Sequence, residues 1–262
     1  MHELRLAARC HLRTAPALLL GALLLALLPA TARAQRSGLL IELEGGAVWQ
    51  SYNDVEIPND GTATRFSLSE LAGTGPWAGG RLYITAPLGG RHALRLLIAP
   101  FSLTESGIPS SAIQFAGESY AAGTPLEATY TFNSYRLTYR YHLHEGARSS
   151  AWVGFTAKVR DAQIALAQGA TASHKDDFGF VPLLHLAGEW RLGPGWHLVA
   201  DMDGLAGGPG RAIDATFKLG RDLGSRWALR AGYRMVEGGA DVNSVYTFAW
   251  LHYAAVSLVV RP

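Results

Sequence analysis

Residues 134–143 read SYRLTYRYHL and alternate strictly between two chemical classes. One set is Tyr135, Leu137, Tyr139, Tyr141 and Leu143, and the other is Ser134, Arg136, Thr138, Arg140 and His142. Successive side chains of a β-strand point to opposite faces, so the stretch predicts a strand with one apolar and one charged face. The fold then depends on which of these two faces is turned outward.

The same alternation recurs along most of the chain, and helical periodicity is scarce. Ten segments show it, at about 39–50, 75–88, 91–106, 126–143, 149–162, 176–192, 195–206, 210–222, 226–239 and 246–261. Each segment is long enough to cross a bilayer as a tilted strand. The pattern predicts an all-β fold, a transmembrane antiparallel up-and-down β-barrel of about ten strands, with eight as the alternative count.

The connections between these segments differ in length on the two sides of the predicted sheet. Tight turns are expected on one side, at 89–91, 144–148, 193–195 and 222–225. Longer loops are expected on the other side at 51–74, 107–125 and 163–175, with short exceptions at 207–209 and 240–245. Short periplasmic turns and long external loops are typical of barrels in the bacterial outer membrane.

A soluble β-sandwich is the main alternative, because its strands also alternate, with the apolar face inside. Two observations already favour the membrane: the strands exceed the usual length in soluble sheets, and the tight turns keep to one side. The third is that Trp190, Trp196 and Trp227 lie on the apolar face beside the tight turns. We therefore predict that these tryptophans form an aromatic girdle at the lipid interface.

The N-terminus has the pattern of an export signal. Arg5, Arg9 and Arg13 precede an apolar run at 17–28, and Ala32-Arg33-Ala34 is an A-x-A cleavage site. The apolar run is too short to span a bilayer as a helix. We predict a cleaved signal peptide over 1–34, a single barrel domain over 35–262, and a location in the bacterial outer membrane.

Cleavage would change the charge balance of the chain. The full chain has 23 basic and 21 acidic residues, and the signal holds four arginines and Glu3, so the mature chain keeps 19 and 20. This balance gives no electrostatic support for nucleic-acid binding. The only cysteine, Cys10, also lies in the signal, so no disulfide or thiolate site is expected in the mature protein.

The charged faces of the strands would line the inside of the barrel. We expect a lumen charge network of Glu42, Glu44, Arg136, Arg140, His185, Asp201, Asp203, Asp214, Lys218, Arg230 and Arg234, with Arg81, Arg95, Lys158 and Glu189 also facing inward. Buried charges are usually paired, which favours a lumen plugged by side chains. A small-solute pore lined by the same charges is an alternative.

Some inward residues suggest catalysis or calcium binding, but the sequence contains no complete motif for either. His185 with Asp201 or Asp203 could form a His–carboxylate pair, and Ser134 is an inward hydroxyl. No omptin-protease or lipid A deacylase pattern is present, so no catalytic residue is assigned and an outer-rim hydrolase stays an alternative. Asp201-Met202-Asp203-Gly204 with Asp214 suggests calcium, but the loop pattern is incomplete, so no metal or cofactor is predicted.

The C-terminal strand resembles the end of small bacterial outer-membrane barrels. Val256, Leu258 and Val260 alternate, and Tyr253 stands where an aromatic residue is common, although the chain ends in Pro262 instead of phenylalanine. The resemblance implies contact with outer-membrane lipids and lipopolysaccharide, and insertion by the barrel assembly machinery. It carries no function with it. The loops at 51–74 and 107–125 suit a structural or binding role whose ligand the sequence does not name.

Overall fold

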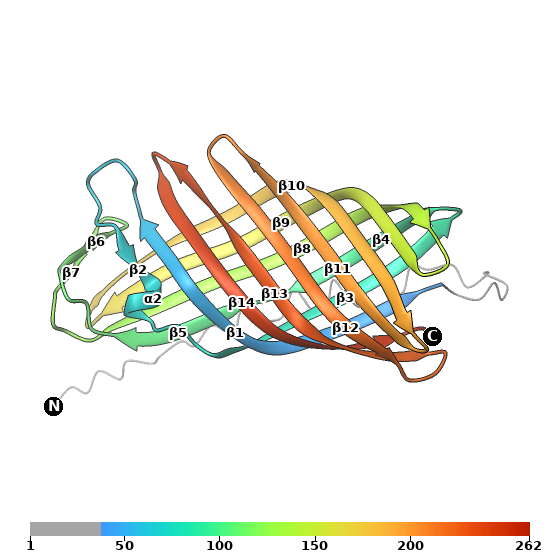
Figure 1. Cartoon of the computed structure of the whole chain (residues 1–262). Coiled ribbons are helices and arrows are strands. Elements are labelled where there is room, and N and C mark those ends of the chain that lie inside the picture. The colour runs from blue at the N-terminus through green and yellow to red at the C-terminus, as the bar shows by residue number, and fades with distance from the viewer. Residues whose placement is uncertain (1–37) are drawn as a thin grey trace, which may run out of the picture. The chain divides into compact units, whose positions relative to one another are not determined.

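The computed structural model describes residues 38–262, which form one closed antiparallel β-barrel (Figure 1). Its strands are β1 (Leu40–Glu56), β3 (Trp77–Gly89), β4 (His92–Ala99), β5 (Ser102–Gly107), β8 (Leu126–Glu145), β9 (Ser149–Gln168), β10 (Thr171–Gly193), β11 (Trp196–Gly207), β12 (Gly210–Asp222), β13 (Trp227–Val242) and β14 (Val245–Val260). β4 and β5 both pair with β8 and act as one strand that is interrupted at Pro100 and Phe101. β14 pairs with β1 and closes the sheet, so the predicted up-and-down barrel of ten strands is confirmed.

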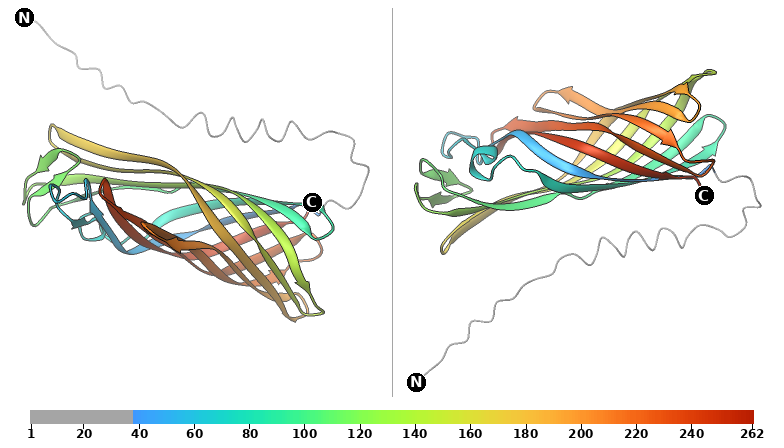
Figure 2. Two further views of the ribbon diagram at one scale, coloured as in Figure 1. Left: turned by 90° about the horizontal axis from the view of Figure 1, so that it is seen from above. Right: turned by 60° about the horizontal axis from the view of Figure 1, so that its bottom comes forward.

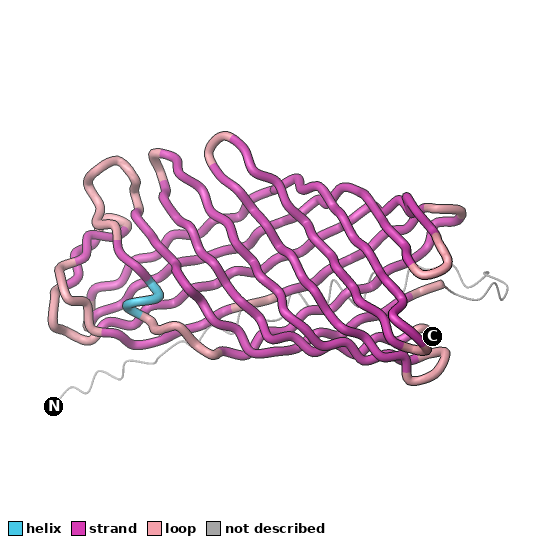
Figure 3. The backbone as a smooth tube through the Cα atoms, viewed as in Figure 1, coloured by secondary structure: helices cyan, strands magenta, loops and turns pink. Residues whose placement is uncertain are grey.

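The two ends of the barrel differ as the connections predicted. The turns β3–β4, β8–β9, β10–β11 and β12–β13 lie at one end, together with the start of β1 and the C-terminus (Figure 3). We call this the short-turn end. Gly89 and Gly90 have φ angles of 105° and 58°, which only glycine adopts at low cost, and this explains the tight β3–β4 turn.

The opposite end, called here the loop end, carries the longer connections and four short elements. These are β2 (Phe66–Ser67) and the one-turn helix α2 (Leu68–Leu71) between β1 and β3, and β6 (Ile113–Phe115) and β7 (Glu118–Tyr120), which pair as a hairpin before β8. No helix within residues 38–262 has the length and hydropathy needed to cross a membrane.

The prediction of a loop at 163–175 is wrong. β9 and β10 continue through this region as a hairpin that turns at 169–170. The alternation persists, because Ile164 and Leu166 are buried on the inner side, and outward-facing Gln163 donates to Asp176 over 2.6 Å. Because the outward residues are polar, this segment lacks the apolar outer face by which the other strands were predicted.

The hairpin β9–β10 reaches past the hairpin β11–β12 at the loop end, while β8 pairs with β9 almost to the β9–β10 turn (Figure 2). β10 pairs with β9 along its whole length, but with β11 only as far as the pair Leu184 and Gly204. Residues 171–183 of β10 therefore form a free sheet edge. The result is a gap in the wall between this edge and the hairpin β11–β12.

Burial is inverted relative to a soluble β-sandwich. Leu184 and Phe217 point outward and are 51% and 67% exposed. Arg136 and Arg230 point inward and are only 3% and 7% exposed. The apolar face is thus the outside of the barrel and the charged face lines the lumen, which confirms the facing predicted from the sequence.

Candidate binding site in the barrel lumen

Three arginines from different strands meet on one carboxylate in the middle of the lumen. Asp214 of β12 accepts from Arg81 of β3 over 2.8 Å, from Arg136 of β8 over 2.7 Å, and from Arg234 of β13. All four side chains are almost fully buried. β12 pairs only with β11 and β13, so the bonds from β3 and β8 cross the lumen.

A second group of crossing ion pairs lies around Lys218 of β12. Its ammonium donates to Glu42 over 2.6 Å, to Ser257 over 2.8 Å, and also to Glu44. Glu42 further accepts from Arg230 over 2.8 Å, and Arg234 donates to Glu44 over 2.9 Å. The two glutamates of β1 are therefore tied to strands that do not neighbour β1 in the sheet.

The aspartates of β11 join the two groups around Asp214 and Lys218, and we call all of these residues together the central charge network. Asp201 accepts from Arg95 over 2.5 Å, and Asp203 accepts from Arg136 over 2.9 Å. Asp203 also bonds the His185 imidazole over 2.8 Å and accepts from the Thr156 hydroxyl over 2.8 Å. The structure thus brings together ten of the eleven residues of the expected lumen network, with Arg81 and Arg95 as further members.

Arg140 is the expected residue that stands apart. Its guanidinium lies over the Trp152 ring, 5.0 Å from the centroid, and makes no ion pair with any described carboxylate. It lines a small cavity of about 130 Å³ on the short-turn side of the network, together with Glu189 and Arg230. Glu189 pairs with Arg230 over 3.5 Å.

The arrangement does not favour the catalytic and calcium alternatives. Ser134 accepts from Arg136 over 3.0 Å, and in the described part of the chain no hydrogen bond joins it to His185. Asp201 and Asp203 are occupied by arginines and by His185. Across residues 38–262, no group of three or more His, Cys, Asp or Glu side chains could hold a metal ion.

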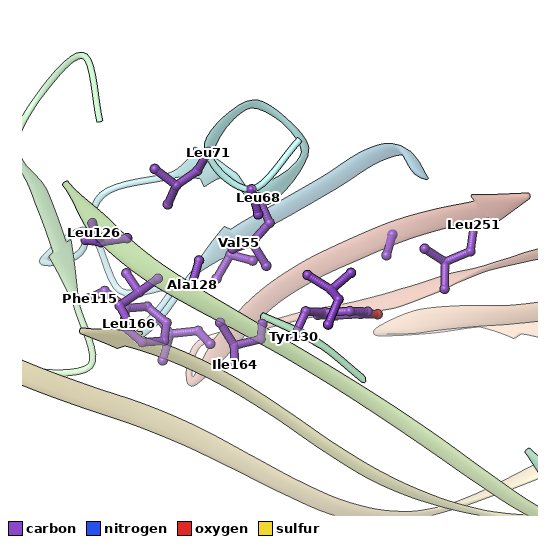
Figure 4. Packing of buried hydrophobic residues seen from close by; sticks show 14 of the residues in the cluster. Val55, Leu68, Leu71, Phe115, Leu126, Ala128, Tyr130, Ile164, Leu166 and Leu251 are labelled. Atoms are coloured by element: carbon purple, nitrogen blue, oxygen red, sulfur yellow. The ribbon is translucent and has the colours of Figure 1, made fainter. Parts of the chain in front are cut away.

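A buried apolar cluster fills the lumen at the loop end (Figure 4). This loop-end cluster includes Val55, Ile57, Leu68, Leu71, Phe115, Tyr120, Leu126, Tyr130, Ile164 and Leu166. It joins α2 and the hairpin β6–β7 to β1, β8 and β9. The Tyr120 hydroxyl donates to the Leu166 carbonyl over 3.1 Å and bonds Ser173 over 2.7 Å, which fixes the hairpin.

Between this cluster and the central charge network lies a cavity of about 580 Å³. We call it the loop-end cavity. Arg136 and Asp214 line the side of the cavity toward the central charge network, and Ile57, Tyr130 and Ile164 line the side toward the loop end. Its size falls in the range of small-molecule binding pockets. No local pattern in the sequence indicates this cavity, although Tyr130 and Arg136 both belong to the inward-facing set of β8.

The loop-end cavity contains a buried cation without a counter-charge. Lys158 of β9 is 3% exposed, and its ammonium lies over the Phe132 ring, 4.7 Å from the centroid. Over residues 38–262 no carboxylate lies within salt-bridge distance of the Lys158 ammonium, and the ammonium forms no hydrogen bond. Arg160, the next inward residue of β9, pairs with Asp177. Lys158 is therefore a buried positive group without a counter-charge in the wall of the cavity, whereas Lys175, which also lines the cavity, is exposed.

The expected interfacial tryptophans lie on the outside of the short-turn end. Trp190 and Trp196 flank the β10–β11 turn, Trp227 begins β13, and all three are exposed. In the last strand, Val256 and Leu258 face outward, whereas Tyr253 faces the lumen beneath Arg81, 5.1 Å from its ring centroid. Tyr253 thus belongs to the interior.

A closed antiparallel sheet with an apolar exterior and a charged interior defines a bacterial outer-membrane β-barrel. No protein-family model and no curated protein sequence matches the chain. The chain is similar in fold to the outer membrane protease OmpT from Escherichia coli, at 12% identity and a TM-score of 0.48, covering 88% of this chain and 99% of that one.

Two further solved structures are similar in the same way. The translocator domain of the autotransporter NalP from Neisseria meningitidis has 13% identity and a TM-score of 0.41, over 94% of this chain and 95% of that one. Neisserial surface protein A has 11% identity and a TM-score of 0.37, over 86% and 98%. At these scores the likeness shows a shared type of fold and carries no function.

Proposed function

We propose that this outer-membrane barrel has a plugged lumen and binds a small ligand from outside in the loop-end cavity. The observation that carries the proposal is the bond from Arg136 of β8 across the lumen to Asp214 of β12. Ion pairs that cross a narrow lumen occupy the space that water and ions would need. Each carboxylate and most cations of the network have a partner, as buried charges require.

The loop end supports a binding role. The cavity is bounded by rigid strands and by the loop-end cluster, and loops on a rigid scaffold commonly carry recognition. A pore would need a continuous water path between the loop-end cavity and the smaller cavity at the short-turn side. An outer-rim hydrolase would need a free carboxylate or histidine beside a nucleophile. Neither alternative has a specific feature of the lumen in its favour.

Electrical recording tests the proposal. The purified barrel is reconstituted into planar bilayers beside a porin prepared in the same detergent. The plugged lumen predicts no conductance steps above the lipid background, while the porin gives steps. Stable steps from the folded wild-type protein, verified by heat-modifiable gel migration, would exclude the plugged lumen.

Membrane partners remain part of the proposal. The exposed apolar belt supports contact with outer-membrane lipids, including lipopolysaccharide, and insertion by the barrel assembly machinery stays a prediction. The signal peptide over 1–34 lies outside the described residues, so its cleavage stays a prediction as well.

A further inference from the structure

We infer that the loop-end cavity binds a single-chain anionic amphiphile of the long-chain fatty-acid class, with its head group at Lys158. This inference rests on the proposed function, because it names the ligand of the same cavity. Three features carry it: a buried cation without a partner, an apolar wall above that cation, and a gap in the barrel wall beside the cavity.

The first feature is the missing counter-charge at Lys158. Burying an ammonium group is costly unless an anion accompanies it. The cross-strand neighbour Arg136 uses its donors on Asp203, Asp214 and Ser134, so it does not compete for a ligand. A carboxylate head group in the cavity would give the Lys158 ammonium the charge-assisted hydrogen bond that it lacks.

The carboxylates in the cavity wall do not cancel this positive charge. Asp214 is shared by three arginines, and Asp177 is bonded by Arg160. Glu237 accepts from Arg211 over 2.9 Å and from the Tyr52 hydroxyl over 2.7 Å. Asp176, the fourth acid of the wall, is exposed and accepts from Gln163 over 2.6 Å. The other three acids are neutralised by cationic partners, which leaves the field at Lys158 favourable for an anion.

The second feature is the apolar wall between Lys158 and the loop end. Phe132 and Tyr130 follow one another on the inner face of β8, with parallel rings 6.3 Å apart, and Ile164 of β9 is the cross-strand neighbour of Tyr130. Val236 and Val245 line the opposite side. A free inorganic anion would leave this surface unused, whereas a hydrocarbon chain would bury it.

The third feature is the gap between the free edge of β10 and the hairpin β11–β12. Gly207 and Pro209 of that hairpin line the cavity, and so does Val181 on the β10 edge. Phe178 and Phe180, on the outer face of the same edge, are 78% and 67% exposed. Unpaired backbone groups are excluded from hydrocarbon, so this gap belongs at the polar interface of the membrane, where amphiphiles collect.

Equilibrium binding of radiolabelled palmitate to the full-length mature barrel in amphipol tests the inference. We expect saturable binding of one palmitate per barrel, no competition by inorganic phosphate, and weak competition by hexadecanol. Lys158→Gln should weaken binding about tenfold or more, because it removes a charge-assisted hydrogen bond. Arg140→Gln is the matched control and should leave binding unchanged, because Arg140 is also an inward cation without an ion pair but lines the cavity on the short-turn side.

A second pair of variants keeps the test valid if Lys158→Gln fails to fold. Lys158→Arg should retain most of the affinity. Gly207→Trp should weaken binding by blocking the gap, and a side chain at this position meets no atom within 4 Å at its Cβ. Folding of every variant is checked by heat-modifiable migration.

The inference is overturned by unchanged palmitate binding in folded Lys158→Gln or Gly207→Trp, by equal binding of hexadecanol, or by full competition from phosphate. Conductance recorded on the same preparation distinguishes a failure of the ligand assignment from a failure of the plugged lumen. Absent palmitate binding in a non-conducting barrel would overturn the ligand class alone. Conductance steps would overturn the plugged lumen, whatever palmitate does.

Discussion

The Lys218 ammonium of β12 donates to the Glu42 carboxylate of β1 over 2.6 Å, although the two residues are 176 positions apart. β1 and β12 are not neighbours in the sheet, so this bond crosses the lumen. It joins a strand from the beginning of the barrel to one near its end. The bond therefore exists only once the barrel has closed, and it links the stability of the barrel to the plugging of its lumen.

Removing the Lys218 charge should destabilise the barrel. Lys218→Met leaves Glu42 with Arg230 alone and deprives Glu44 of one of its cations, and an uncompensated buried charge costs about 3–5 kcal/mol. Urea unfolding in detergent micelles, followed by tryptophan fluorescence, measures the loss. Arg148→Met, at an exposed position of the β8–β9 turn, is the control and should change stability little. Equal stability of both variants would mean that the crossing bond does not hold the barrel together.

A charge on the outer face should harm insertion into lipid. Phe217→Arg and Leu184→Arg each place a guanidinium on the apolar exterior, which costs about 2–4 kcal/mol near the bilayer midplane. Folding into lipid vesicles, measured by heat-modifiable migration at increasing urea, reports the effect. Leu223→Arg introduces the same charge in the β12–β13 turn and should be tolerated. Normal folding of all three variants would count against the lipid-facing assignment.

The loop-end cluster should control the order of the hairpin β6–β7. Phe115 is almost fully buried and packs edge-on against Phe66 at 5.9 Å between ring centroids. Phe115→Ala opens a cavity in this cluster, a change that typically costs about 3–5 kcal/mol in a packed core. Amide hydrogen exchange over residues 108–125 should become faster, while exchange in β12 and β13 stays unchanged.

The exposed neighbour Ile108 provides the comparison for that experiment. Ile108→Ala removes a side chain that is 65% exposed, so exchange over the hairpin should stay near the wild-type rate. If Phe115→Ala and Ile108→Ala behaved alike, the cluster would not be the element that orders the loop end.

The strands could be predicted because their signal is local. In 134–143 and 213–219 the side-chain classes alternate residue by residue, and alternation alone determines which residues share a face. The membrane assignment followed from the same pattern together with the short turns. The hairpin at 163–175 was not predicted, because its outward positions include the polar residues Gln163 and Asp176, which are as common in loops as in strands.

The partners inside the lumen could not be predicted in the same way. Arg136 and Asp214 are 78 positions apart and meet only because the sheet closes with a particular stagger between strands. The sequence places both side chains inward, but it does not say which strands face each other across the barrel. The loop-end cavity depends on the same closure and on the packing of Phe115 and Tyr120, which no local pattern encodes.

The central claim is that ion pairs crossing the lumen plug this barrel, and the Lys218–Glu42 pair tests it most directly. Solid-state NMR in lipid bilayers measures the dipolar coupling between the Lys218 ¹⁵Nζ and the Glu42 ¹³C carboxyl carbon. The structure predicts a strong coupling, consistent with the 2.6 Å contact between nitrogen and carboxylate oxygen, and slow exchange of the ammonium protons with water. No detectable coupling together with rapid proton exchange, in a folded wild-type barrel, would contradict the account.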